Sequence, residues 1–181
     1  MNKSIPKLHD TKYGYGEISL LNHWIVALFI VALLVLGLVY DGLPKSDASK
    51  QVIFWHASVG LLAIPFIIWR VIWRMRSGFP DNRSSGKEKL LARSLQWLLL
   101  IAITLQIITG PMYLGTEAEP LPFFGLFEIP SPFTEEAHAL HEAVETVHKY
   151  VANPLLLILL GLHLFGALKR IFFDKKTTLT Q

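Results

Sequence analysis

The sequence predicts an all-α integral membrane protein, a four-helix bundle that forms a single domain over residues 1–181. The chain is 52% hydrophobic but only 17% charged, whereas a soluble domain has about 25% charged residues. The charged residues leave four charge-free stretches of 23, 19, 23 and 19 residues, and roughly 20 apolar residues span a bilayer as a helix. The chain has no cysteine, which excludes disulfides, thiolate metal sites and thiol nucleophiles.

The first charge-free stretch predicts a helix over residues 18–40. This segment is too long, and its start too acidic, for a cleaved signal peptide, and no small-x-small cleavage site follows it. The connection over 41–51 contains glycine, proline, serine and aspartate, which favour a turn. We therefore expect a second helix over 52–73.

A second turn-rich connection, over 74–93, precedes a predicted helix over 94–114. A long loop over 115–146, rich in proline and glutamate, leads to the last predicted helix over 147–173. The Asn153-Pro154 pair is expected to kink or loosen that helix one to two turns after His148, because proline lacks the backbone N–H.

Lysine and arginine are distributed unevenly between the two sides of the predicted bundle. Fourteen of them lie in the two terminal tails and the middle connection, and three lie in the other two connections. Because basic residues are retained on the cytoplasmic side, we predict that both termini are cytoplasmic. The net charge of +3 therefore reflects membrane topology and contact with lipid, and no nucleic-acid partner is expected.

Four of the seven histidines lie in or beside the charge-free stretches: His23, His56, His148 and His163. In the predicted topology His23 and His163 lie near the cytoplasmic face, and His56 and His148 lie near the outer face. An ionisable residue inside a membrane span is costly and marks a candidate functional site. The sequence thus predicts two histidine pairs, one at each side of the membrane.

Helix geometry indicates what such pairs can bind. His148 and His163 are 15 residues apart, which gives a rise of roughly 22 Å and a net rotation of about 60°. Both therefore face one sector of their helix, which suits two haems, each ligated by imidazoles from two helices. Since the chain has no Cys-x-x-Cys-His motif, the haems are expected to be non-covalent. A single such histidine is more often a hydrogen-bonded core residue, so a haem-free membrane transporter or scaffold is the alternative.

Four further residues are candidates for contact with a haem. Gly60 and Gly110 allow a flat macrocycle to approach a helix, although small residues equally serve helix packing. Arg70 and Arg74, at the cytoplasmic end of the second helix, are placed either to pair with propionates or to reach lipid headgroups.

The outer loop carries an H-x-x-H motif at His138 and His141. Residues three apart share a helix face, so a weak metal site is one interpretation of this motif. The neighbouring glutamates favour the other interpretation, a solvated acidic helix.

These features resemble the bacterial cytochrome b561 family over almost the whole chain. The resemblance rests on His23-Trp24 in ISLLNHWIVALFIV, on WHASVGLLAIPFIIWRVIWR in the second helix, on VHKYVANPLLLILLGLHLFGALKR in the fourth, and on PLPFFGLFEIP in the outer loop. It implies a diheme b-type cytochrome of the bacterial inner membrane. The implied ligand pairs, His23 with His163 and His56 with His148, match the pairing by depth.

The resemblance further implies single-electron transfer between the quinone pool and a redox protein or small-molecule donor on the periplasmic side. The third helix has no histidine, so we expect it to pack in the bundle and to line a ubiquinone cleft. No residue is assigned a catalytic role.

Two kinds of relative imply different redox partners, so the partner of this chain is not fixed by the resemblance. One branch of the family oxidises superoxide and reduces ubiquinone, and related sequences are b-type anchor subunits of hydrogenases and dehydrogenases. An acidic outer surface does not attract the superoxide anion. The basic residues available on that side are Lys45, Lys50 and Lys149.

Overall fold

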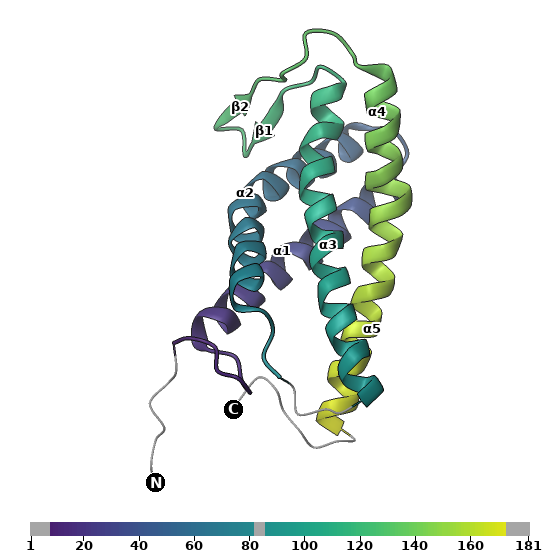
Figure 1. The fold of residues 1–181 in the computed structure, drawn as a ribbon. Coiled ribbons are helices and arrows are strands. Elements are labelled where there is room, and N and C mark those ends of the chain that lie inside the picture. Colours follow the sequence, from purple (N-terminus) through teal and green to yellow (C-terminus); the bar gives the residue numbers. More distant parts are fainter. Residues whose placement is uncertain (1–7, 82–85, 173–181) are drawn as a thin grey trace.

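The structure is a computed structural model that describes residues 8–81 and 86–172 and is mostly helical (Figure 1). Its elements in chain order are α1 (Glu17–Gly42), α2 (Asp47–Ser77), α3 (Gly86–Thr116), β1 (Leu121–Phe123), β2 (Phe127–Ile129), α4 (His138–Glu145), the π-helix η1 (Thr146–Ala152) and α5 (Asn153–Phe172). Helices α4, η1 and α5 run on as one helix. Within the described ranges, four helices are long and apolar enough to cross a membrane, which makes the chain a multi-pass membrane protein.

Each predicted helix is present; the first three extend beyond both predicted ends, and the fourth begins before its predicted start. The helix expected over 94–114 spans Gly86–Thr116, and the helix expected from residue 147 begins at His138. Charge-free stretches mark the hydrocarbon core, whereas a helix continues into the headgroup region, where charged side chains meet water. The predicted last residue of the fourth helix, Phe173, lies outside the described residues.

Turn chemistry sets both ends of α2. Ser46 and Ser49 form a capping box: Ser46 Oγ accepts from Ser49 N at 3.3 Å, and Ser49 Oγ accepts from Ser46 N at 3.0 Å. The helix ends at Gly78, whose φ of 64° is a conformation that favours glycine. The turn signals in the sequence therefore correspond to real helix boundaries.

The structure is mostly helical, as predicted, and the loop expected over 115–146 contains a short β-hairpin. Strands β1 and β2 pair antiparallel, with Phe123 opposite Phe127. Residues 124–126 connect the strands: Phe124 and Gly125 both have positive φ, 53° and 71°, and Leu126 N donates to the Phe123 carbonyl at 2.9 Å. Strands of three residues carry too little period-2 pattern to be read from a sequence rich in proline and phenylalanine.

The loosening expected near Pro154 takes the form of the π-helix η1. Proline offers no N–H, and its ring crowds the carbonyl four residues earlier, so the preceding turn widens. Accordingly Asn153 N bonds to the carbonyl of His148, five residues earlier rather than four. His148 thus lies in the widened turn of a continuous helix.

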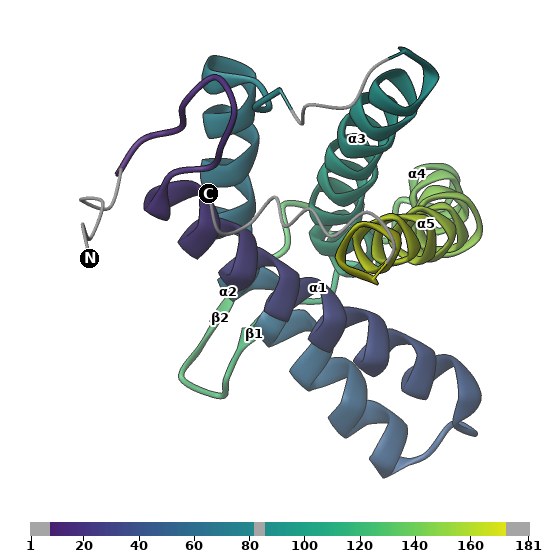
Figure 2. The same ribbon diagram turned by 90° about the horizontal axis from the view of Figure 1, so that it is seen from below.

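The helices pack as two groups that meet in a central core. Helix α1 packs along α2, while α3 contacts both α2 and α5, and Figure 2 shows α1 and α2 on one side with α3, α4 and α5 on the other. The core is built from apolar side chains of all four spans: Val26, Ile30, Ala63, Ile67, Leu100, Ala102, Ile103, Leu156 and Leu159. Large side chains outside the core, such as Leu28 and Phe165, are exposed, as a lipid-facing surface requires.

The bundle has two distinct ends (Figure 1). We call the end with the start of α1, the end of α2 and the end of α5 the terminal end, and the end with β1 and β2 the hairpin end. These names do not depend on the orientation of the chain in a membrane.

Candidate functional site

Two histidine pairs bridge the two groups of helices, one at each end of the bundle. At the terminal end His23 of α1 faces His163 of α5, with ring centroids 6.2 Å apart and ring planes 63° apart. At the hairpin end His56 of α2 faces His148 of η1, with centroids 6.4 Å apart and planes 87° apart. The structure therefore brings together the four histidines in the predicted pairs.

The spacing of each pair fits one metal ion between the rings. A metal–imidazole bond is about 2.0–2.1 Å long. The nitrogen lies about 1.1 Å from the ring centroid for ring bonds of about 1.33 Å. Two rings on opposite sides of one metal ion would therefore have centroids about 6.3 Å apart, and the observed values are 6.2 and 6.4 Å.

The hairpin-end pair lies in a cavity whose glycines leave room around the rings. A Cβ at Gly110 would lie 3.3 Å from His148 Cε1, and one at Gly37 would lie 3.4 Å from His56 Cε1. Gly60, also predicted for this role, lines the same cavity, although a Cβ there would meet only Leu33 at 3.8 Å. The roles of Gly60 and Gly110 toward a macrocycle stay predictions.

Two buried polar atoms in this cavity lack a partner. His56 Nδ1 and Gln106 Oε1 make no hydrogen bond of good geometry within the described part of the chain. Both residues line the cavity, together with His148 and apolar side chains from α1, α2 and α3. Buried polar atoms without partners are rare, and they are expected where a bound group completes a site.

Helix α3 contributes contacts to His148 that the sequence did not reveal. Thr109 Oγ1 lies 2.9 Å from His148 Nδ1, and Gln106 Nε2 donates to the His148 carbonyl at 3.4 Å. Thr109 is 7% exposed. The sequence analysis gave these two residues no role toward a histidine, because a threonine in an apolar helix carries no signal of its partner 39 residues away.

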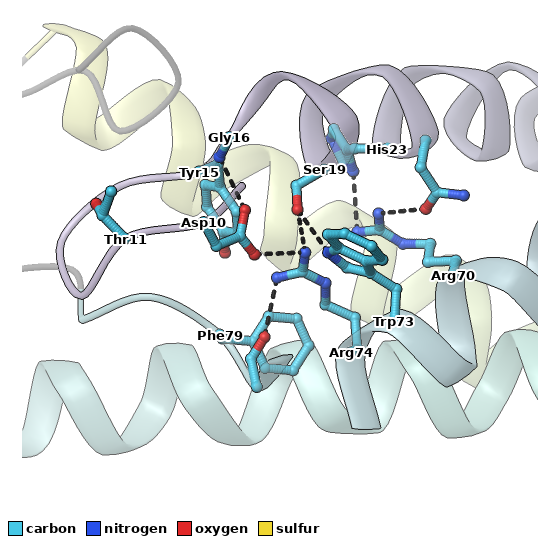
Figure 3. A network of polar contacts seen from close by, with 12 residues as sticks. Asp10, Thr11, Tyr15, Gly16, Ser19, His23, Arg70, Trp73, Arg74 and Phe79 are labelled. Carbon is cyan, nitrogen blue, oxygen red and sulfur yellow. Dashed lines mark hydrogen bonds and ion pairs between the residues drawn. The ribbon is translucent and has the colours of Figure 1, made fainter. Parts of the chain in front are cut away.

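At the terminal end, the two predicted arginines have different surroundings (Figure 3). Arg70 Nη2 lies 3.1 Å from His23 Nδ1, and Arg70 Nη1 donates to Asn22 Oδ1 at 3.3 Å. Arg74 is 1% exposed and donates to Asp10, to Ser19 and to the carbonyl of Gly78. Arg70 thus adjoins the histidine pair, whereas Arg74 holds together the surrounding chain, and neither role toward a propionate is tested.

Asp10 links the segment before α1 to the end of α2 (Figure 3). Its carboxylate accepts from Arg74 Nη2 at 2.8 Å and from Gly16 N at 2.8 Å. Burial opposes ionisation of Asp10, but hydrogen bonds from Ser19 and Gly16 and the charge of Arg74 outweigh it and lower the pKa of this carboxyl. His9, which received no role from the sequence, stacks on Trp73 with centroids 5.9 Å apart.

A second cavity lies beside His23, and Tyr15 of the segment before α1 is part of its wall. Polar and apolar side chains of three helices and the loop after α2 complete its lining: Ser19, Leu20, His23, Arg70, Arg74, Phe79, Gln96, Leu99, Leu100 and Ile103. Burial raises the pKa of the Tyr15 phenol, so this group stays a protonated donor. Helix α3 thus lines a cleft with both polar and apolar walls.

The two histidines of the H-x-x-H motif face different partners. His138 lies on the surface with its Nδ1 3.0 Å from Glu136. His141 packs inward, with Nδ1 3.1 Å from Thr116 Oγ1 and its ring against Tyr113. Among the residues that the structure describes, no group of three or more histidine, aspartate or glutamate side chains is placed to hold a metal ion.

Comparison with known proteins agrees with this architecture. A family model described as prokaryotic cytochrome b561 matches residues 14–181. Cytochrome b561 homolog 2 of Escherichia coli (strain K12) is 30% identical over 181 aligned positions, which cover 94% of this chain and 91% of that relative. The match includes all four spans and both histidine pairs. The chain belongs to the prokaryotic cytochrome b561 family.

Proposed function

We propose that this chain binds two non-covalent b-type haems and carries single electrons across a bacterial inner membrane. Family membership establishes the coarser statement, that the chain is a membrane b-type cytochrome of electron transfer. The observation that supports the proposal most strongly is the presence of two histidine pairs at metal-bridging distance, one at each end of the bundle.

The proposed ligands are His23 and His163 at the terminal end, and His56 and His148 at the hairpin end. Bound haem supplies one-electron chemistry at its iron. Each haem would be held by two imidazoles from different helices, and apolar side chains of the bundle would surround it. In the proposed orientation the terminal end faces the cytoplasm, in keeping with the lysine and arginine distribution.

Arg70 has a defined part in this proposal. Arginine only donates hydrogen bonds, so its contact with His23 Nδ1 leaves the proton of a neutral ring on Nε2. If Nε2 held a metal, the proton of a neutral ring would have to be on Nδ1, and Arg70 could not donate to that nitrogen. The guanidinium would then be available to a propionate, and this pairing is part of the proposal.

Quinone is the proposed partner at the terminal end. The cavity beside His23 offers polar donors from Tyr15, Arg70 and Gln96 and an apolar wall from α3, a combination that suits a quinone head group. At the hairpin end, Lys149 is held by Glu145 at 3.1 Å and by the Tyr113 hydroxyl at 3.0 Å. Such pairing weakens a basic funnel for superoxide, so we favour quinone-linked transfer with another periplasmic donor.

Haem quantification is the experiment that tests this proposal. The full chain, purified from a membrane fraction, is expected to contain two haems per chain by the pyridine haemochrome assay. Its reduced-minus-oxidised spectrum is expected to show b-type bands, and a ubiquinol analogue is expected to reduce them. One haem per chain would contradict the two-site proposal, and a chain without haem would refute the cytochrome function itself.

A further inference from the structure

We propose that Thr109 is a positioning residue that fixes the ring orientation and the tautomer of His148. This inference rests on the proposed ligation of a haem by His148. It concerns a residue of α3, a helix without histidines, and it assigns that helix a part in the hairpin-end site.

The hydrogen bonds of Thr109 determine where its proton goes. A hydroxyl has one hydrogen, and a carbonyl oxygen only accepts. Thr109 Oγ1 lies 2.7 Å from the Leu105 carbonyl, so it donates its hydrogen there. The same Oγ1 lies 2.9 Å from His148 Nδ1, and with its hydrogen already used it can only accept from that nitrogen.

The tautomer of His148 follows from these two hydrogen bonds of Thr109. The ring N–H is on Nδ1, and a neutral imidazole then carries its lone pair on Nε2. A metal-binding imidazole needs this arrangement, and the group that accepts from its other nitrogen fixes the ring. Because Thr109 is buried, water does not readily replace it.

Three further contacts restrict His148 to this position. Gly110, next to Thr109, leaves space for the ring, since a Cβ there would lie 3.3 Å from Cε1. Gln106 and Asn153 both donate to the His148 carbonyl. Thr109 thus acts on the side chain while Gln106 and the widened helical turn hold the backbone. His56, across the cavity, has no hydrogen bond of good geometry to any described residue through its Nδ1.

The test compares three variants of the full-length, haem-loaded chain. Thr109→Val removes the acceptor and keeps the side-chain shape, whereas Thr109→Ser keeps the hydroxyl. Thr104→Val is the matched control, because Thr104 Oγ1 makes the same bond to the Leu100 carbonyl at 2.7 Å, and no histidine contact is found for it in the described structure. Each variant is examined by low-temperature electron paramagnetic resonance and by haem transfer to apomyoglobin.

In Thr109→Val we expect a changed low-spin ferric signal for one of two haems and about 10-fold faster loss of that haem. Thr109→Ser and Thr104→Val are expected to resemble the unmodified chain. Two unchanged signals in Thr109→Val, or an equal change in Thr104→Val, would overturn the role of Thr109. If Thr109→Val does not fold, Thr109→Ala replaces it, and a haem signal in Thr109→Ser as altered as that in Thr109→Ala would overturn the role as well. An unmodified chain without haem would instead refute the proposed function.

A second, independent observation concerns the β1–β2 hairpin. One face of the hairpin is apolar, because Phe123 pairs with Phe127 and Leu121 pairs with Ile129. Leu126 at the turn is 77% exposed and Phe127 is 53% exposed. The stretch between Glu119 and Glu128 has no charged residue.

The hairpin is attached to a part of α2 that lies within a membrane span. Ser58 Oγ donates to the Pro122 carbonyl at 3.2 Å and accepts from Phe124 N at 3.0 Å. Trp55, one turn from Ser58, packs edge-on against Phe124. Both residues of α2 belong to its charge-free stretch over 51–69, so the hairpin leaves the bundle at the depth of that stretch rather than beyond its end.

We infer that the tip of this hairpin lies in the lipid headgroup and upper acyl region of the bilayer leaflet at the hairpin end. Aromatic and apolar side chains without charge favour this region. Leu126, Phe127 and Ile129 are exposed, and ring contacts connect Phe127 through Phe123 and Phe124 to half-exposed Trp55 on α2. Three exposed side chains also offer far less surface than the roughly 800 Å² per partner that a stable protein interface buries.

Because the chain has no cysteine, single-cysteine spin labels report on this directly. Leu126→Cys and the control Glu135→Cys are labelled in nanodiscs, and their collisions with oxygen and with a nickel chelate are measured. The label at Leu126→Cys is expected to collide often with oxygen and rarely with the nickel chelate. The label at Glu135→Cys is expected to collide often with the nickel chelate and less with oxygen. Equal nickel access at both positions would place the tip in water. A label at position 126 that neither reagent reaches would show a protein cover. Either result overturns the inference.

Discussion

We expect the His148→Ala chain to purify with one haem instead of two. The substitution removes one of two imidazoles at the hairpin end, where the cavity is lined mainly by apolar side chains and His56 and His148 are its two histidines. The terminal-end pair lies on α1 and α5 and shares no ligand with it. Pyridine haemochrome analysis and the ferric resonance signals would show the loss, with the surviving haem unchanged.

The matched control for this prediction is His141→Ala. His141 lies two turns earlier on the same continuous helix, but its ring contacts Thr116 and Tyr113 rather than His56. It is expected to keep both haems. Two haems in His148→Ala would rule out His148 as a ligand. Loss of both haems, with the helix content unchanged by circular dichroism, would contradict two independent sites.

The pairing of the histidines was predictable from the sequence because the bilayer is a strong constraint on depth. Charge-free stretches locate each span, and alternating direction then places His23 with His163 and His56 with His148. The rotation between His148 and His163 assumed a uniform 100° per residue, and η1 departs from that value. The structure still directs both rings inward, since a broad sector of the helix faces the other spans.

Contacts between side chains far apart in the sequence were not predictable in the same way. Thr109 and Ser58 are small polar residues in apolar helices, and their partners lie 39 to 66 residues away. The segment before α1 was treated as a tail because it is short and polar. Its position depends on Asp10 and Arg74, 64 residues apart, and no local pattern couples them.

The largest effect on stability is expected at this ion pair. Arg74 and Asp10 expose 2% and 9% of their side chains, so Asp10→Asn leaves a buried guanidinium without its counter-charge. Breaking a buried pair on one side costs about 3–5 kcal/mol, whereas breaking an exposed pair costs about 0–1 kcal/mol. Asp47→Asn is the control, because its partner Lys50 and Asp47 itself are both exposed. Thermal unfolding in detergent, followed by circular dichroism, measures the difference.

The pH dependence of unfolding separates the charge of Asp10 from its shape. The folded chain lowers the pKa of Asp10 below its ordinary value of 3.8, so the folded state is more stable when this carboxyl is ionised. The resulting stability is fully present at pH values well above 3.8 and is lost as the pH falls through the lowered pKa of the folded state. Asp10→Asn is therefore expected to unfold at lower temperature at pH 7 and to lose less further stability on acidification than the unmodified chain. The unfolding temperatures of the two proteins could instead fall equally on acidification. This result would mean that another group compensates Arg74, and that the closure of the terminal end does not depend on this carboxylate.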